Sequence, residues 1–270
     1  MVKISVLQDY IYLILVEFDK ICRKHDIKYS IEGGTLMGAV KFQNFVPWDD
    51  DIDVVMVRDQ YEKFLQIAPT ELNSDFYLAS YNNEEKFPYN FAKLYFDVTK
   101  VTDFPYVDIP KIKHRIFIDI FPVDNVVPKI LNYHCSMVGV LTGARRVKLR
   151  KKNKVKSISQ LLYKIFSLLP IKMLINLVDK VCRIYNKKDT GFIYEVSNPN
   201  RNFPPMPSSL YAEYTELQFR DKKFMAIKEY DKFLKSRFGE DYANKMPDET
   251  ERIASHNLDM KIIFDVKCDK

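Results

Sequence analysis

Residues 47–56 constrain the fold most, because they combine a run of carboxylates with the alternating pattern of a strand. The apolar members of the alternation are Ile52, Val54 and Met56. Asp51 and Asp53 fall between them, and side chains two residues apart leave a strand on the same face. With Asp49 and Asp50 beside them, these carboxylates repel one another unless water or a cation compensates their charge. The stretch predicts a half-buried strand whose exposed end holds a hard cation such as Mg²⁺.

The acidic run does not have the spacing of a calcium-binding loop. An EF-hand loop that starts at Asp49 requires glycine where the chain has Val54 and glutamate where it has Gln60. Both requirements fail, so an EF-hand is excluded. A solvated acidic turn without a ligand is the alternative that stays open.

Two glycines precede the acidic run by a short distance. Residues 27–31 predict a short strand, Gly33 and Gly34 follow it, and residues 35–40 predict the first turns of a helix. Glycines at such a junction let a phosphate approach backbone N–H groups at the start of a helix. The spacing matches neither a P-loop nor a dinucleotide-binding fingerprint. A tight turn that binds nothing is the competing interpretation.

A further aspartate lies inside an apolar segment. Asp119 sits within residues 116–121, which otherwise read Ile-Phe-Ile and Ile-Phe around it. A carboxylate is costly to bury in a strand unless a cation or hydrogen-bond donors compensate its charge. The segment therefore predicts a second core strand that contributes one carboxylate to a functional site. Asp124, which follows Pro122, is interpreted as a turn residue or helix cap.

Composition places the chain among globular proteins. Its 270 residues are 47% hydrophobic and 14% aromatic, enough to bury a core as one domain or as one domain with an appendage. An amphipathic helix is expected over residues 4–25, and its charges argue against a signal peptide or a membrane span. The four cysteines are far apart and form no Cys-x-x-Cys pair. Reduced thiols and a cytoplasmic location are expected.

A basic segment is followed by an apolar one in the second half of the chain. Residues 145–156 contain eight basic side chains and no acidic one, and residues 158–181 predict two apolar helices that meet near Pro170. Nucleic-acid binding is not expected, because no aromatic residues alternate with the basic ones and no known module accompanies them. Two interpretations stay open: a helical subdomain packed on the core, and peripheral contact of residues 145–181 with an anionic membrane surface.

The motifs together resemble one known family. The sequence Gly-Gly-Thr-Leu-Met-Gly-Ala at 33–39, followed by Phe-Val-Pro-Trp-Asp-Asp-Asp-Ile-Asp at 45–53, is similar to the signature of the LicD (fukutin-related) family. The resemblance covers residues 1–125 and 210–260 well. It implies an α+β fold of the nucleotidyltransferase (polymerase-beta) type, a twisted mixed sheet with flanking helices and a helical insertion. The expected parts are a catalytic core over 1–135, the insertion over 136–190 and a C-terminal segment over 191–270 that packs back on the core.

The resemblance also implies roles for single residues. Asp51, Asp53 and Asp119 are expected to bind Mg²⁺, or alternatively Mn²⁺, and Asp49 is expected to accept a proton. The nucleotide and its phosphates are assigned to Gly33, Gly34, Thr35 and Lys93. Trp48 and His256 are substrate-binding candidates, Trp48 through a cation–π contact with choline. Three structural roles stay open instead: a solvent-facing strand position for Lys93, core packing for Trp48, and a structural histidine at 256.

The implied activity is metal-dependent transfer of phosphocholine from CDP-choline to a hydroxyl group of a cell-surface glycan or glycolipid precursor, with release of CMP. Transfer of ribitol phosphate, glycerol phosphate or phosphoethanolamine by the same fold is an alternative. An NTP-dependent nucleotidyltransferase is a second alternative. A membrane-surface or glycan-binding scaffold without activity is the third.

Overall fold

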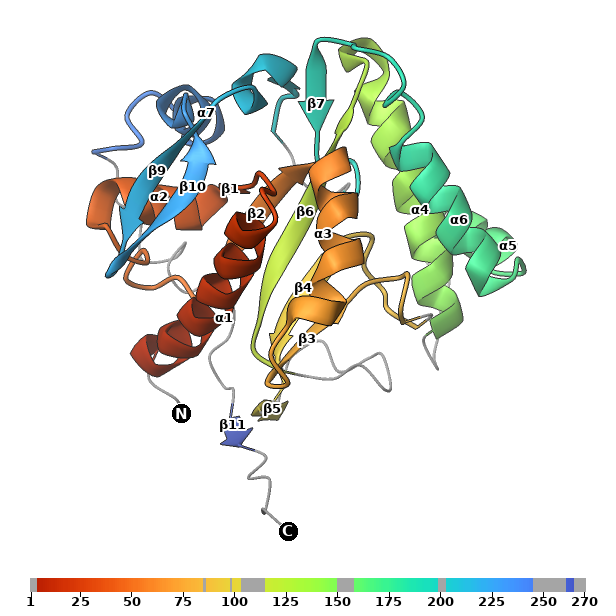
Figure 1. The fold of residues 1–270 in the computed structure, drawn as a ribbon. Helices are drawn as coiled ribbons and strands as arrows, with labels where there is room; N and C mark the ends of the chain where they lie inside the picture. The colour runs from red at the N-terminus through yellow and green to blue at the C-terminus, as the bar shows by residue number, and fades with distance from the viewer. Residues whose placement is uncertain are drawn as a thin grey trace.

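A curled mixed sheet forms the centre of the molecule (Figure 1). The computed structural model describes residues 4–84, 86–97, 99–102, 115–149, 158–198, 203–244 and 261–264. The strands of this sheet are β1 (Ser30–Ile31), β2 (Asp53–Val57), β3 (Phe76–Ala79), β4 (Ala92–Phe96), β6 (Phe117–Asn125), β7 (Phe192–Tyr194) and β8 (Met206–Pro207). The main path runs β1-β2-β6-β4-β3, and β7 pairs with both β6 and β8.

The central strands β2 and β6 run parallel, whereas β1 and β4 pair with them antiparallel. Valine makes up most of β2, and β6 contains isoleucine, phenylalanine and valine. β-branched and aromatic side chains favour the pleated conformation. The register aligns Asp53 with Asp119 and Val55 with Phe121. The two predicted core strands are therefore direct neighbours, and their aspartates lie side by side.

Two helices, α1 (Ile4–Lys24) and α3 (Arg58–Glu71), pack against the central strands and cover one face of the sheet (Figure 1). Each presents an apolar stripe at helical spacing to the core. The fully buried members of these stripes include Ile14, Leu15, Phe18, Tyr61 and Phe64. The structure confirms the helix expected over residues 4–25.

The C-terminal half returns to the beginning of the chain. The hairpin of β9 (Tyr214–Phe219) and β10 (Lys222–Ile227) packs beside β1 and α2 (Gly33–Phe42), and α7 (Tyr230–Phe238) packs against α2. One anchor is the backbone N–H of Ile227, which donates to Ser30 Oγ at 3.0 Å. The hairpin thereby holds the strand that leads into the Gly33 turn.

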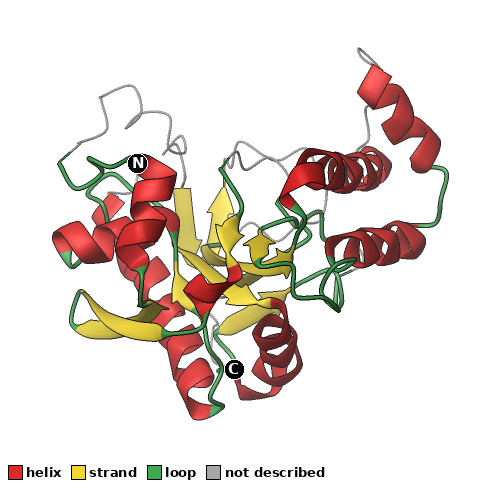
Figure 2. Cartoon of the chain, turned by 90° about the horizontal axis from the view of Figure 1, so that it is seen from above, coloured by secondary structure: helices red, strands yellow, loops and turns green. Residues whose placement is uncertain are grey.

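Three helices stand beside the sheet instead of over its face (Figures 1 and 2). They are α4 (Leu131–Leu149), α5 (Ile158–Phe166) and α6 (Ile171–Cys182). Buried apolar residues of α4 and α6 form a cluster of their own with Val126, Tyr194 and Val196, separate from the main core. The predicted meeting of two helices near Pro170 is confirmed, because Pro170 is the residue that precedes α6.

The remaining elements are short. They are the strand pair β5 (Thr99–Thr102) and β11 (Lys261–Phe264), and the 3₁₀ helices Pro128–Ile130 and Ser208–Tyr211. Cys22, Cys135 and Cys182 are free thiols. Among the helices that the structure describes, none is both long enough and apolar enough to cross a bilayer.

The architecture fits the expected α+β class, with two local corrections. β2 begins at Asp53, so Asp51 precedes the strand instead of forming part of it. Asp124 is not a turn residue or a helix cap. It lies within β6, is 1% exposed and pairs with Arg58, because β6 continues two residues further to pair with β7 at Asp124 and Asn125.

Candidate active site

Three charged side chains form a row across three neighbouring strands. Asp53 on β2 is in register with Asp119 on β6, and Asp119 is in register with Lys93 on β4. Residues directly opposite each other in a sheet leave it on the same face. Ile118 and Ile120, which flank Asp119, are fully buried and leave the sheet on the other face. One face of the sheet therefore carries the charges, and the other carries core.

Lys93 is held at this row by several contacts. Its ammonium forms an ion pair with Asp119 and lies 3.5 Å from the centre of the Phe117 ring. The Lys93 residue is 4% exposed, so the solvent-facing alternative is wrong. A buried ammonium next to a carboxylate and an aromatic face is strongly positioned, because both contacts stabilise the cation.

The glycine turn lies against the aspartates. Gly33 adopts a φ of +56°, a left-handed conformation that favours glycine. A Cβ atom on Gly33 would lie 3.7 Å from Asp53 Oδ2, and one on Gly34 would collide with Asp49 Oδ2. The turn therefore has no room for a side chain at Gly34, because the Asp49 carboxylate occupies that space. Gly33 is constrained by its φ and not by space, since a Cβ there would be at an ordinary contact distance from Asp53.

Two further contacts fix the geometry of the turn. Thr35 is buried, and its Oγ1 accepts the backbone N–H of Asp53 at 3.0 Å. Gln8 on α1 donates to the backbone carbonyl of Asp49 at 2.8 Å. The start of α2 is thereby tied to the first residue of β2, and α1 holds the segment that precedes it. Thr35 positions Asp53, whatever else it binds.

The carboxylates gather more tightly at the beginning of the acidic run than the sequence suggested. Asp49, Asp50 and Asp51 each place an oxygen within 4.8 Å of the other two. Burial raises the pKa of Asp51 well above its usual range, and the negative charges of Asp53, Asp49, Asp50 and Asp119 raise it further. Of the four aspartates expected in the site, Asp49 and Asp51 belong to this tight group, together with Asp50, which was not expected. Asp53 and Asp119 lie outside the group but near enough for their charges to act on Asp51.

This cluster has the properties of a divalent-cation site. Hard cations such as Mg²⁺ bind to carboxylate oxygens, and like charges at this spacing need a cation or protons for compensation. Both the donor set and the raised Asp51 pKa fit such an ion. Asp51, Asp53 and Asp119 stay the predicted ligands, with Asp49 and Asp50 next to them.

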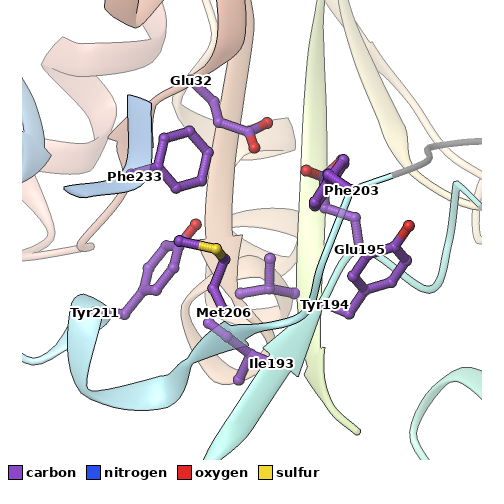
Figure 3. Close-up of a pocket in the computed structure, with 9 residues that line it drawn as sticks. Glu32, Ile193, Tyr194, Glu195, Phe203, Met206, Tyr211 and Phe233 are labelled. Carbon is purple, nitrogen blue, oxygen red and sulfur yellow. The ribbon is translucent and has the colours of Figure 1, made fainter. Parts of the chain in front are cut away.

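A small pocket opens beside the glycine turn (Figure 3). Glu32, the residue before Gly33, and Glu195 lie at one side of it, each about 2% exposed or less. Aromatic rings make up much of the rest: Tyr194, Phe203, Tyr211 and Phe233. The guanidinium of Arg237 pairs with Glu32 at 2.5 Å and with Glu195 at 3.6 Å, and it lies 4.1 Å from the centre of the Phe203 ring.

Among the residues that the structure describes, two carboxylates and one guanidinium meet at this pocket. One effect is seen at Tyr211, whose pKa burial raises well above the usual value, with the charges of Glu32 and Glu195 adding to the shift. Aromatic walls next to carboxylates attract cations. The guanidinium of Arg237 shows that the walls accept a planar cation.

Comparison with known proteins identifies the family. Residues 26–136 match the family model described as LicD/FKTN/FKRP, nucleotidyltransferase domain. The chain is 30% identical over 261 residues to the lipopolysaccharide cholinephosphotransferase LicD of Haemophilus influenzae, covering 88% of this chain and 91% of that protein. This chain belongs to the LicD family of transferases. A shorter match, 39% identical over 59 residues, links 22% of the LicD-family chain with 19% of an uncharacterised protein of Rickettsia typhi.

The matched region of this LicD-family chain contains most of the predicted site. Residues 26–136 include the glycine turn at Gly33 and Gly34, the acidic run at 49–53, Lys93 and Asp119. Trp48 is half-buried and precedes the acidic run directly, so it stays a prediction as a substrate contact. His256 lies outside the described residues.

Sequence reasoning missed the pocket residues for a physical reason. Glu32, Glu195 and Arg237 come from three distant segments, and no local motif marks any of them. The position of Glu32 directly before the two glycines was an available signal. The contact of Arg237 with Glu195 and Glu32 becomes visible only in the folded structure.

Proposed function

We propose that this LicD-family chain transfers phosphocholine from a CDP-linked donor to a hydroxyl group of a glycan or lipid-linked glycan and releases CMP. The observation that carries the proposal is the gathering of aspartates around the Gly33 turn. It is supported by the 30% identity to a protein named as a lipopolysaccharide cholinephosphotransferase. A fold of the nucleotidyltransferase type is part of the same proposal.

The aspartates divide the work of the proposed reaction. Asp51, Asp53 and Asp119 would hold Mg²⁺ or Mn²⁺, which supplies charge neutralisation on the donor phosphates and the leaving CMP. Asp49 accepts the proton of the attacking hydroxyl group. The hydroxyl oxygen bonds to the phosphorus that carries choline, while the bond from this phosphorus to the oxygen of CMP breaks.

The other residues of the site position the donor. Lys93 places a positive charge beside Asp119, where it offsets charge on the donor diphosphate. The first backbone N–H groups of α2, which begins at Gly33, are the proposed contact for a phosphate oxygen of the donor. Thr35 holds Asp53 in place, because its Oγ1 accepts a hydrogen bond from the backbone N–H of Asp53.

The pocket beside Glu32 is the proposed site for the trimethylammonium group. Its rings and carboxylates suit a cation that has no hydrogen-bond donors. Asp53 and Glu32 are joined through the backbone, because the Glu32 N–H donates to the Asp53 carbonyl at 3.0 Å. The headgroup pocket therefore adjoins the strand that carries the phosphate chemistry. The open space in the pocket is about the size of one water molecule, so the headgroup would have to displace the Arg237 guanidinium from Glu32 and Glu195.

The function is tested by incubating the full chain with Mg²⁺ and CDP-choline, CDP-ethanolamine, CDP-glycerol or CDP-ribitol, together with a glycan acceptor, and measuring CMP release. CMP from CDP-choline is expected, with EDTA abolishing it. Asp53→Asn is expected to lower kcat by about a hundredfold or more, because several kcal/mol of transition-state stabilisation pass through the ion. Pyrophosphate release from an NTP, or no CMP from any donor, would contradict the proposal.

The glycine turn offers a matched pair of variants for the same assay. Gly34→Ala is expected to lower activity strongly, because the new methyl group collides with the Asp49 carboxylate. Gly139→Ala, at a position of α4 where no atom lies within 4 Å of the added Cβ, is expected to leave activity unchanged. Equal rates for the two variants would contradict the assigned geometry.

The headgroup pocket is tested by Glu195→Gln in the donor panel. The KM for CDP-choline is expected to rise while the KM for the neutral-headgroup donor CDP-glycerol stays the same, because only a cationic headgroup needs the carboxylate. A rise for both donors would indicate a structural role for Glu195 and would leave the transferase assignment intact.

A further inference from the structure

The charges of this chain are distributed unevenly along its sequence. Residues 125–178 contain eleven of the 42 lysine and arginine residues and none of the 36 acidic ones. The remainder of the chain has 31 basic and 36 acidic residues, a formal charge of −5. The excess of positive charge therefore belongs to the part of the sequence that contains α4, α5 and the first two thirds of α6.

The same part exposes large apolar side chains. Six of them lie on α5, on the turn after it and on the start of α6, and they are 36% to 83% exposed: Leu161, Leu162, Ile165, Phe166, Leu168 and Met173. We call these six residues the α5 surface. Apolar residues at this density on a soluble protein mark a contact site.

The contacts between α5 and α4 explain why the six residues of the α5 surface are exposed to solvent. The ring of Tyr163 packs over Gly143 of α4, where an added Cβ would lie 2.8 Å from it. Lys148 Nζ donates to the carbonyls of Ser167 and Leu169 at 3.1 and 2.8 Å. Tyr163 and Lys148 thus attach α5 and its turn to α4, and the apolar stripe of α5 faces away from the contact.

Exposed lysines border the α5 surface. Lys164 lies within it on α5, and Lys172 lies next to Met173 on α6, both exposed. A short helix with an apolar stripe and lysines at its edge is the pattern of helices that lie in the interface of a membrane. Anionic lipids attract such lysines, and the attraction decreases within a Debye length.

We propose that the α5 surface binds an anionic membrane, with its apolar side chains inserted at the level of the lipid headgroups. A second copy of the chain is the weaker choice of partner, because a symmetric contact would bring two basic, acid-free surfaces together. This proposal does not depend on which group the enzyme transfers. It accounts for the concentration of positive charge in residues 125–178 of the sequence.

The proposal is tested by sedimentation of the full chain with vesicles of phosphatidylcholine alone or of phosphatidylcholine mixed with phosphatidylglycerol. Binding is expected only to the mixed vesicles and is expected to weaken with salt. The triple variant Leu161→Ser, Ile165→Ser, Leu168→Ser and the double variant Lys164→Glu, Lys172→Glu are each expected to weaken binding about tenfold or more.

A matched control changes apolar residues of similar exposure elsewhere. Val6→Ser with Leu13→Ser alters two exposed side chains of α1 and is expected to leave vesicle binding unchanged. Circular dichroism melting curves establish that each variant is folded. No binding of the unchanged chain to mixed vesicles, or equal loss in the α1 control, would overturn the proposal. So would a dimer in light scattering that the α5 variants dissociate and that does not bind vesicles.

Discussion

At the scale of single residues, the acidic run is held in an electrostatically unfavourable arrangement by the rest of the fold. Asp51 interacts with four other carboxylates, and its pKa is raised by burial first and by these charges second. Gly34 leaves room for Asp49, and Thr35 fixes Asp53. The fold therefore maintains a cluster of negative charge that costs stability and that a divalent ion would neutralise.

Asp51→Asn is predicted to stabilise the chain in EDTA and to abolish transfer. A carboxyl group whose pKa is higher in the folded than in the unfolded state stabilises the fold at low pH and loses that contribution as pH rises. The stability advantage of Asp51→Asn should therefore grow above the unfolded aspartate pKa of about 3.9, by at most about 1.4 kcal/mol per pH unit. It should level off near the raised folded pKa.

The measurement is thermal unfolding of both proteins from acid to neutral pH, first with EDTA and then with Mg²⁺. Mg²⁺ should stabilise the unchanged chain more than the variant. Asp241→Asn, an exposed aspartate near the C-terminal end of α7, serves as the control. A variant less stable than the unchanged chain in EDTA at neutral pH would show that Asp51 is not under electrostatic strain.

At the scale of elements, a buried ion pair joins three segments. Arg58, the first residue of α3, donates through Nε to Asp124 Oδ1 on β6 at 2.8 Å, and its other contact to Asp124 measures 2.5 Å. Asn186, which follows α6, donates to the same carboxylate at 2.5 Å. The start of α3, strand β6 and the segment after α6 therefore meet at the Asp124 carboxylate.

Arg58→Met is predicted to destabilise the chain by about 3–5 kcal/mol, because it leaves Asp124 buried without its cation. The double variant Arg58→Met, Asp124→Leu is expected to recover much of that loss, since no charge then remains to be compensated. Urea unfolding measures both. The single variant Asp124→Leu completes the comparison. If the double variant loses as much free energy of unfolding as the two single variants together, the two residues are not coupled.

Strand β6 shows which features could be predicted from the sequence and which could not. Alternation within residues 51–56 and 116–121 was enough to predict two core strands with aspartates on one face, because that pattern is local. The end of β6 was missed because its pairing partner is β7, about seventy residues later in the chain. Asp124 was misinterpreted for the same reason, since Arg58 and Asn186 are both distant in sequence. The pocket of Glu32 and Glu195 is likewise built from distant segments.

At the scale of the whole molecule, the buried side chains form two main clusters. The main cluster fills the space between α1, α3, the sheet and the C-terminal hairpin. The second belongs to α4 and α6 and the segments next to them. Within residues 161–166 of α5, no side chain is buried. Local stability follows the density of such buried contacts.

Amide hydrogens of α5 are therefore predicted to exchange faster than those of α1. Local opening of α5 exposes little apolar surface, whereas opening of α1 requires disruption of the main cluster. Hydrogen exchange followed by mass spectrometry compares peptides from the two helices in one experiment. Equal protection in both would mean that α5 opens only when the whole chain unfolds.

The separate packing of α4 and α6 has a consequence for engineering and for evolutionary change. Because this layer fills its own interior, its outward residues are free to be exchanged without repacking the strands that hold the aspartates. A chimera that grafts the corresponding helices of a related transferase would have to keep the Arg58 and Asn186 tether to Asp124 and the contacts of Arg145 and Thr142 with Asn90. Such a chimera is expected to retain its chemistry and to present a different outer surface.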